Sequence, residues 1–254
     1  MKHILLLLVL MAFFIVGCGE KKPKEKFSLT IFAAASLTEA LNEIAELYKA
    51  SVPEATLNFN FDSAGKLQIQ IENGAEADLF LSAGQKQMDA IAETYIDSAT
   101  RKNVLVNKVV LIVPQNSTKG IESFEDCLDD KVSVIAFGNP STPLWDYTQG
   151  IFTFLNGWDK ITLKASLGTN VKEVLSQVEG GSVDAGVVFA TDAATGKNVK
   201  VVAEAPKGSH KPAIYPAAVL KNSKQPKEAK AFLDYLSSSQ ATAVFEKIGF
   251  EVVK

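Results

Sequence analysis

Four short stretches place hydroxyl, amide and small residues directly ahead of an apolar periodic segment. They are A-A-A-S-L-T-E (33–39), F-D-S-A-G-K (61–66), F-G-N-P-S-T-P-L-W (137–145) and S-L-G-T-N-V-K-E (166–173). Each is expected to join a strand to a helix, and a helix start leaves free N–H groups at the positive end of the helix dipole. Several such starts facing one cleft would bind an anion without a charged side chain. The same residue types also act as plain helix caps, so both roles stay open.

Individual residues in these joints carry more specific expectations. Ser36 stands three residues before Glu39, which is the spacing of a capping box. In the second joint, Ser63 is the one hydroxyl residue and Ala64 follows it. Asp62, beside them, is expected to point outward, because an inward carboxylate would repel an anion.

Catalysis and metal binding have little support in the sequence. The chain has two histidines and two cysteines, and after the first 18 residues only His210 and Cys127 remain. These residues cannot build a zinc site, and no G-x-S-x-G elbow is present. The net charge of -3 gives no footprint for nucleic acid. We therefore expect no enzyme, no metal, no nucleic-acid partner and a surface or hinge position for His210.

The N-terminus reads as a targeting segment. A positive residue, Lys2, precedes the apolar run 4–16, which is shorter than the roughly 20 residues of a membrane-spanning helix. The run ends in I-V-G-C, which resembles a lipobox, so residues 1–18 are predicted to be a lipoprotein signal peptide with lipidation at Cys18. The alternative is an ordinary signal peptide. Residues 19–26 are polar and predict a flexible tether.

Strand and helix patterns alternate along the rest of the chain, with one of the predicted strands at 161–166. This alternation favours an α/β fold of mostly parallel sheets with helices on both faces. Two extended segments, 106–114 and 205–220, break the pattern. They predict two lobes joined by a two-strand hinge, with a ligand cleft between them. Lobe 1 is expected to comprise 27–107 and 205–254, and lobe 2 to comprise 108–204.

Four segments carry a family resemblance. They are I-F-A-A-A-S-L-T-E-A-L-N-E-I-A, F-N-F-D-S-A-G-K-L-Q-I-Q-I-E-N-G-A-E-A-D-L-F-L-S-A-G-Q-K-Q-M-D, G-N-P-S-T-P and G-V-V-F-A-T-D-A. From about residue 29 to 250, the chain closely resembles the molybdate-binding proteins of bacterial ABC importers. The resemblance implies a type II periplasmic-binding-protein fold that captures molybdate, and tungstate of nearly the same size, for an ABC permease and its ATPase. It also implies a monomer outside the cytoplasm, in the periplasm or anchored by lipid to the outer face of a monoderm membrane.

The resemblance further implies which residues bind the oxyanion. Ser36 matches a family serine, whereas Ala64 and Phe189 stand where the family has a serine and a tyrosine. Leu144 and Val171 match positions that donate from the backbone. Ser63 is the hydroxyl that the second joint still offers.

The two lost hydroxyls leave the identity of the anion open. Hydrogen bonds to a charged group contribute roughly 1.5–3 kcal/mol each, so losing two without replacement would weaken binding on the order of a hundredfold or more. Ser63, Thr169, Tyr147 or Trp145 could compensate. The alternatives are another tetrahedral oxyanion such as sulfate or phosphate, or a hydrolase or sensor on the same two-lobed frame.

Overall fold

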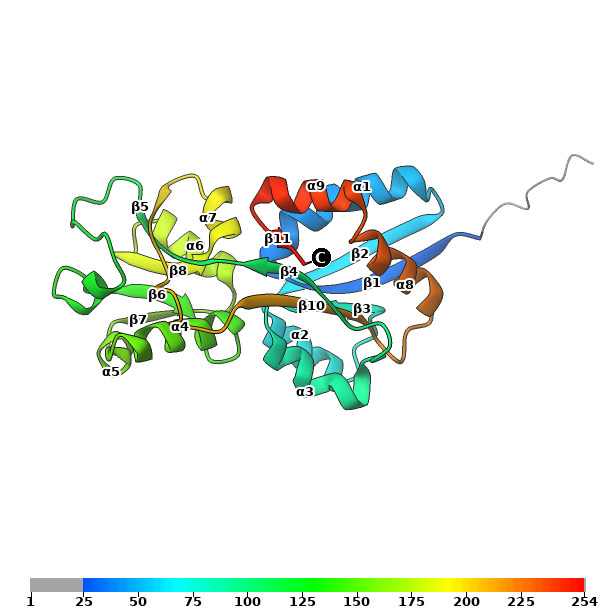
Figure 1. Ribbon diagram of the computed structural model, residues 1–254, viewed down its shortest axis with the longest axis horizontal. Coiled ribbons are helices and arrows are strands. Elements are labelled where there is room, and N and C mark those ends of the chain that lie inside the picture. The colour runs from blue at the N-terminus through cyan, green and yellow to red at the C-terminus, as the bar shows by residue number, and fades with distance from the viewer. Residues whose placement is uncertain (1–24, 254) are drawn as a thin grey trace, which may run out of the picture.

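Short apolar runs form two separate sheets in the computed structural model, which describes residues 25–253 (Figure 1). The first sheet contains β1 (Phe27–Ala34), β2 (Ala55–Asp62), β3 (Leu79–Leu81), β4 (Lys102–Asn107), β10 (Ala213–Val219) and β11 (Glu251–Val252). Its strand order is β11-β4-β10-β3-β1-β2. The second contains β5 (Val109–Pro114), β6 (Ile135–Gly138), β7 (Ala165–Gly168), β8 (Ala185–Phe189) and β9 (Val199–Glu204), in the order β7-β6-β8-β5-β9.

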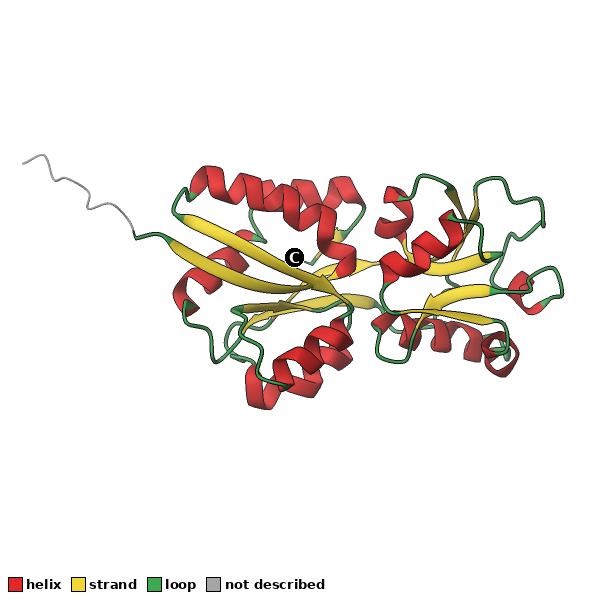
Figure 2. Cartoon of the chain, turned by 180° about the vertical axis from the view of Figure 1, so that it is seen from behind, coloured by secondary structure: helices red, strands yellow, loops and turns green. Residues whose placement is uncertain are grey.

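Helices cover both faces of each sheet, as the view from behind shows (Figure 2). In the first lobe these are α1 (Thr38–Ser51), α2 (Ala64–Glu72), α3 (Gln85–Tyr95), α8 (Pro226–Tyr235) and α9 (Ser239–Ile248), with a short 3-10 turn, η1 (Ala35–Leu37), before α1. In the second they are α4 (Pro143–Phe154), α5 (Trp158–Thr162), α6 (Val171–Glu179) and α7 (Ala190–Thr195), with the 3-10 turn η2 (Glu125–Leu128). The predicted α/β class with helices on both faces is confirmed.

Apolar periodicity explains how these helices pack. In α1, Leu41, Ile44 and Tyr48 are buried on one face, and the Tyr48 ring meets the Phe232 ring of α8 edge-on at 5.0 Å. Helix α9 starts after the cap residue Ser238 and ends at Gly249, whose φ of 105° suits glycine. The apolar core lies between each sheet and its helices.

The sheets are mixed, which corrects the expectation of mostly parallel sheets. Four of the nine neighbouring strand pairs are parallel and five are antiparallel. For the four antiparallel pairs that involve β5 or β10, the reason is the two-lobed chain path. The parallel strands end toward the other lobe, whereas a strand that has just crossed starts there and runs in the opposite direction, as β5 and β10 do.

The predicted strand 161–166 is wrong in its first half, because Trp158–Thr162 is helix α5 and the strand begins at Ala165. The segment alternates apolar and polar residues, but the alternation does not correspond to two sheet faces. Ile161 lies within α5 and is fully buried, whereas Leu163 is 88 % exposed in the turn that follows.

The chain crosses between the sheets twice, at Lys108 and within 205–212, inside the two predicted hinge segments. The predicted lobe bounds, 27–107 with 205–254 and 108–204, divide the strands in the same way. It stays a prediction that each of these two units moves as one body.

The predicted signal segment 1–18, its Cys18 and most of the tether 19–26 lie outside the described residues. Within the described range, no helix is both long and apolar enough to cross a membrane.

Candidate functional site

A small cavity lies between the two lobes, where parallel strands of both sheets end. All six residues that the sequence predicted as ligand-binding line it: Ser36, Ser63, Ala64, Leu144, Val171 and Phe189. The other lining residues are Ala34, Ala35, Ala83, Thr142 and Pro143. The site therefore forms outside the carboxyl ends of the strands, as α/β sheets generally place it.

The cavity has the size of one small ion. The centre of a water-sized sphere can move within a volume of about 20 Å³ inside the cavity. Adding the radius of the sphere gives a hollow of about 3 Å in radius. A central atom with four oxygens around it is of this size, whereas a sugar or an amino acid is larger.

Three helix starts converge on the cavity, and each has a side-chain cap. Ser63 caps α2 by accepting from Lys66 N–H at 3.4 Å, Thr142 caps α4 by accepting from Trp145 N–H at 3.1 Å, and Asn170 caps α6 by accepting from Glu173 N–H at 3.1 Å. In each helix, the backbone N–H groups that precede the capped N–H group have no acceptor inside the helix. At the cavity, these free N–H groups are those of Ala64, Leu144 and Val171. Capping and an anion-binding geometry thus coexist.

The expected capping box at Ser36 is wrong. Helix α1 starts after Leu37 without a side-chain cap, because the η1 turn already closes the strand-to-helix joint. Ser36 instead shares a hydrogen bond of 2.8 Å with the hydroxyl of Tyr215. The carboxylate of Glu39 binds Lys172 of the other lobe.

The two positions without a hydroxyl form apolar walls of the cavity. Ala64 is 1 % exposed, and the Phe189 ring packs edge-on against the rings of Tyr147 and Tyr215, with centroids 5.9 and 5.7 Å away. Of the four possible compensating residues, Ser63 lines the cavity. The others do not; the Tyr147 hydroxyl donates to the Ala83 carbonyl, for example, at 3.2 Å.

The lining carries no ionisable side chain. Asp62 does not line the cavity, but it does not point outward as expected. Its Oδ1 accepts from Ser63 N–H at 2.7 Å and from Asn170 Nδ2 of the other lobe at 3.4 Å. Among residues 25–253, no three His, Cys, Asp or Glu side chains gather where they could hold a metal ion. The polar groups that face the cavity are therefore neutral donors and hydroxyls, aided by helix dipoles.

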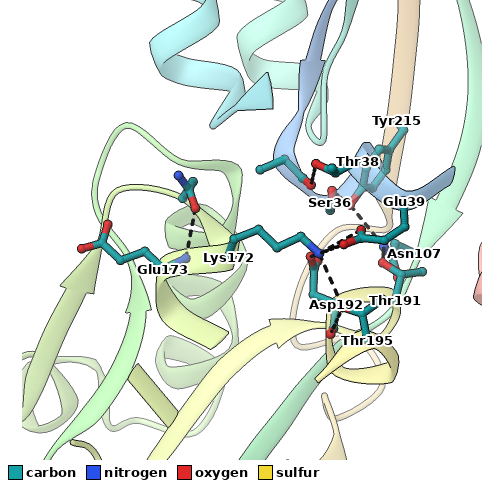
Figure 3. Close-up of polar contacts among 12 residues, drawn as sticks. Ser36, Thr38, Glu39, Asn107, Lys172, Glu173, Thr191, Asp192, Thr195 and Tyr215 are labelled. Carbon is teal, nitrogen blue, oxygen red and sulfur yellow. Dashed lines mark hydrogen bonds and ion pairs between the residues drawn. The ribbon is translucent and has the colours of Figure 1, made fainter. Parts of the chain in front are cut away.

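A buried side-chain network extends from Ser36 into the second lobe (Figure 3). The Tyr215 hydroxyl lies 3.2 Å from Asn107 Nδ2, which also donates to Thr191 Oγ1 at 2.8 Å. Asn107 ends β4 and Thr191 lies in α7, so the network passes beside the first hinge crossing. Sequence reasoning missed Tyr215 and Asn107, because each reads as an ordinary residue of an apolar strand.

Ion pairs also join the lobes around the cavity. Lys172 Nζ lies 2.9 Å from Glu39 and 3.2 Å from the fully buried Asp192, as Figure 3 shows. Burial raises the pKa of Asp192 to about 6, although Lys172 opposes this shift. Burial acts to lower the pKa of Lys172, but Asp192 and Glu39 outweigh it and the net shift is upward. On another side, Lys86 Nζ lies 2.8 Å from Asp146.

A backbone contact shows how closely the lobes approach. A Cβ atom added to Gly65 of α2 would lie 1.7 Å from the Ser141 carbonyl oxygen of the other lobe. Glycine is therefore required at this position for the lobes to meet as they do.

A larger open groove, of about 830 Å³, also lies between the lobes and includes His210 in its lining. It is a weaker candidate for an anion site. Its lining carries charges of both signs, from Asp89 and Asp146 and from Lys86 and Lys211, and it contains none of the six predicted ligand residues.

Comparisons with known proteins show the family and the fold of the chain. A family model described as "Bacterial extracellular solute-binding protein" matches residues 29–251. The chain is 40% identical to a Bacillus subtilis protein named "Putative ABC transporter substrate-binding lipoprotein YvgL". The alignment covers 98% of this chain and 98% of that protein. It is 36% identical to the Escherichia coli molybdate-binding protein ModA, in an alignment that covers 88% of this chain and 89% of that protein. The structure of the Azotobacter vinelandii periplasmic molybdate-binding protein, 19% identical, superimposes with a TM-score of 0.79 over 89% of this chain and 100% of that one.

Proposed function

The chain belongs to the bacterial extracellular solute-binding protein family, and from this premise we propose that it captures molybdate outside the cytoplasm and delivers it to an ABC importer. The observation that carries the proposal is the neutral cavity of one-ion size at which helix starts from both lobes meet. The relatives named molybdate-binding support the choice of anion.

Each of the six predicted ligand residues has a role in this proposal. Molybdate is a dianion that offers only acceptor oxygens, so it requires donors. The hydroxyls of Ser36 and Ser63 and the N–H groups of Ala64, Leu144 and Val171 supply them. The Phe189 ring and the Ala64 methyl keep water out, which strengthens each of these hydrogen bonds. Tungstate, nearly the same size, binds in the same way, whereas sulfate is smaller and makes poorer contacts with both lobes.

Binding works through closure of the lobes about the two crossings. Because the donors come from both lobes, the anion interacts fully only with the closed form and shifts the population toward it. The bodies that move are 27–107 with 205–254 and 108–204. The permease and its ATPase then take up the anion, and the binding protein catalyses no reaction.

The site of action lies at the outer face of the membrane. Lipidation of Cys18 anchors the monomer there, and residues 19–26 act as the tether. A relative whose name includes the word lipoprotein supports this placement.

Calorimetric titration of the protein with molybdate, tungstate, sulfate and phosphate tests the proposal. We expect tight one-to-one binding of molybdate and tungstate and much weaker binding of the other two. Preference for sulfate or phosphate would move the function to another oxyanion importer. No heat and no thermal stabilisation with any of the four would overturn oxyanion capture.

A further inference from the structure

Tyr215 and Asn107 stand behind Ser36, outside the set of residues that line the cavity. Resting on the proposed function, we propose that Asn107 and Tyr215 fix the Ser36 hydroxyl as a hydrogen-bond donor to the bound oxyanion. They are positioning residues, because they act on the anion through Ser36.

A backbone hydrogen bond sets the orientation of the Asn107 amide. The Lys108 N–H donates to Asn107 Oδ1 at 2.9 Å, so the amide oxygen faces the backbone. The amide nitrogen therefore faces Tyr215 and Thr191, at 3.2 and 2.8 Å. An amide nitrogen can only donate, so the oxygen of Tyr215 must accept from Asn107.

The direction of the next hydrogen bond follows from burial. Tyr215 is 1 % exposed, and within residues 25–253 the one acceptor in reach of its proton is Ser36 Oγ, at 2.8 Å. If Ser36 donated instead, the Tyr215 proton would be buried without an acceptor among the described residues, which is costly. Burial also raises the pKa of Tyr215 well above its usual value, so the phenol keeps its proton. Tyr215 therefore donates and Ser36 accepts.

Ser36 then has its own proton free for the cavity. A serine that already accepts from Tyr215 donates to an anion oxygen without competing for another partner. This suits an oxyanion that carries no proton. The network also includes Thr191 of the second lobe, so the orientation of Ser36 is set in the arrangement in which both lobes surround the anion.

A double-mutant cycle with molybdate titrations of the full-length protein tests this inference. We expect Ser36→Ala to weaken molybdate binding roughly tenfold to a hundredfold, and Tyr215→Phe to cause most of the same loss. If Tyr215 acts through Ser36, the double variant binds about as well as Ser36→Ala alone. If the fold loss in molybdate affinity of the double variant equals the product of the losses of the two single variants, the inference is overturned.

Tyr147→Phe is the matched control. Tyr147 is also a buried tyrosine near the cavity, but its hydroxyl donates to the Ala83 carbonyl and does not contact Ser36. When Tyr147→Phe is combined with Ser36→Ala, the fold losses in molybdate affinity of the two single variants should multiply. If thermal unfolding shows that Tyr215→Phe does not fold, Asn107→Ala takes its place in the cycle with the same expected non-additivity. Wild-type protein that binds no molybdate would refute the proposed function and this inference together, whereas binding with an additive cycle refutes the inference alone.

Discussion

Lys172 of α6 and Glu39 of α1 form an ion pair between the two lobes, with Lys172 Nζ 2.9 Å from both carboxylate oxygens. Lys172 directly follows Val171, which lines the cavity. The pair therefore holds the two lobes together next to the cavity. In the proposed closure mechanism, the pair forms as the lobes close and breaks as they separate.

Glu39→Gln should weaken molybdate binding about twofold to fivefold, because a partly exposed ion pair contributes up to about 1 kcal/mol. The change should shrink as salt is added, since salt screens the pair. Titration calorimetry at low and high ionic strength measures both effects. Glu43→Gln is the control: Glu43 pairs with Lys247 at 2.9 Å within the first lobe, so its loss should leave binding unchanged. Equal losses in the two variants would contradict a role in closure.

Gly65→Ala should abolish closure while both lobes stay folded. The added methyl would meet the Ser141 carbonyl oxygen at 1.7 Å, and neither backbone can yield without the lobes moving apart. We expect molybdate affinity to fall tenfold or more, and small-angle X-ray scattering with molybdate present to show an extended shape. Gly180→Ala, at the end of α6, is the control. A Gly65→Ala variant that binds molybdate as well as wild type would show that the closed contact is unnecessary.

Ala64→Ser should strengthen molybdate binding, because it returns a hydroxyl to the position where the resembling family has one. A new hydrogen bond to the dianion is expected to raise affinity roughly tenfold. Ala64→Val, which adds bulk without a donor, should instead weaken binding, because the cavity has room for one ion only. Calorimetry compares the two variants. Weaker binding by both would mean that Ser63 already occupies the place of the missing hydroxyl.

Asp192→Asn should change how stability depends on pH between about 4 and 6. Burial raises the pKa of Asp192 from the ordinary 3.8 to about 6, so the folded state holds this proton more tightly than the unfolded state. The stabilisation from this carboxyl is thus complete below about pH 4 and is lost as pH rises to 6, by no more than about 3 kcal/mol. Urea unfolding at pH 4 to 7 should show this decline in wild type and a flatter curve in Asp192→Asn.

Asp126→Asn is the control, because the pKa of Asp126 is shifted in the opposite direction to that of Asp192. A hydrogen bond from Lys131 lowers the pKa of Asp126 to about 2, so its stabilisation is present above about pH 4 and is lost as pH falls toward 2. That variant should alter the urea curve at the acid end only. If Asp192→Asn changes nothing between pH 4 and 6, Asp192 does not titrate there in the folded protein.

The sequence predicted the lining of the cavity better than it predicted the connections behind it. Ser36, Ser63 and Val171 lie at strand-to-helix joints, where local turn chemistry and a family pattern both mark the position. Tyr215 and Asn107 reach the site through tertiary contacts, from strands distant in sequence from Ser36, so no local pattern marks them.

Errors in the predicted fold have the same origin. The strand at 161–166 followed an alternation that tertiary packing overrides, since Ile161 is buried and Leu163 is exposed. The antiparallel strands follow from the path of the chain between lobes, which periodicity does not describe.

An anomalous difference map from crystals grown with molybdate shows directly whether the anion binds between the lobes, because molybdenum scatters strongly and is located without bias from the protein. We predict one strong peak there, with the molybdate oxygens in hydrogen-bond reach of Ser36 Oγ and the N–H groups of Ala64, Leu144 and Val171. A peak in the larger groove beside His210, or no peak from crystals of the closed form, would contradict this prediction.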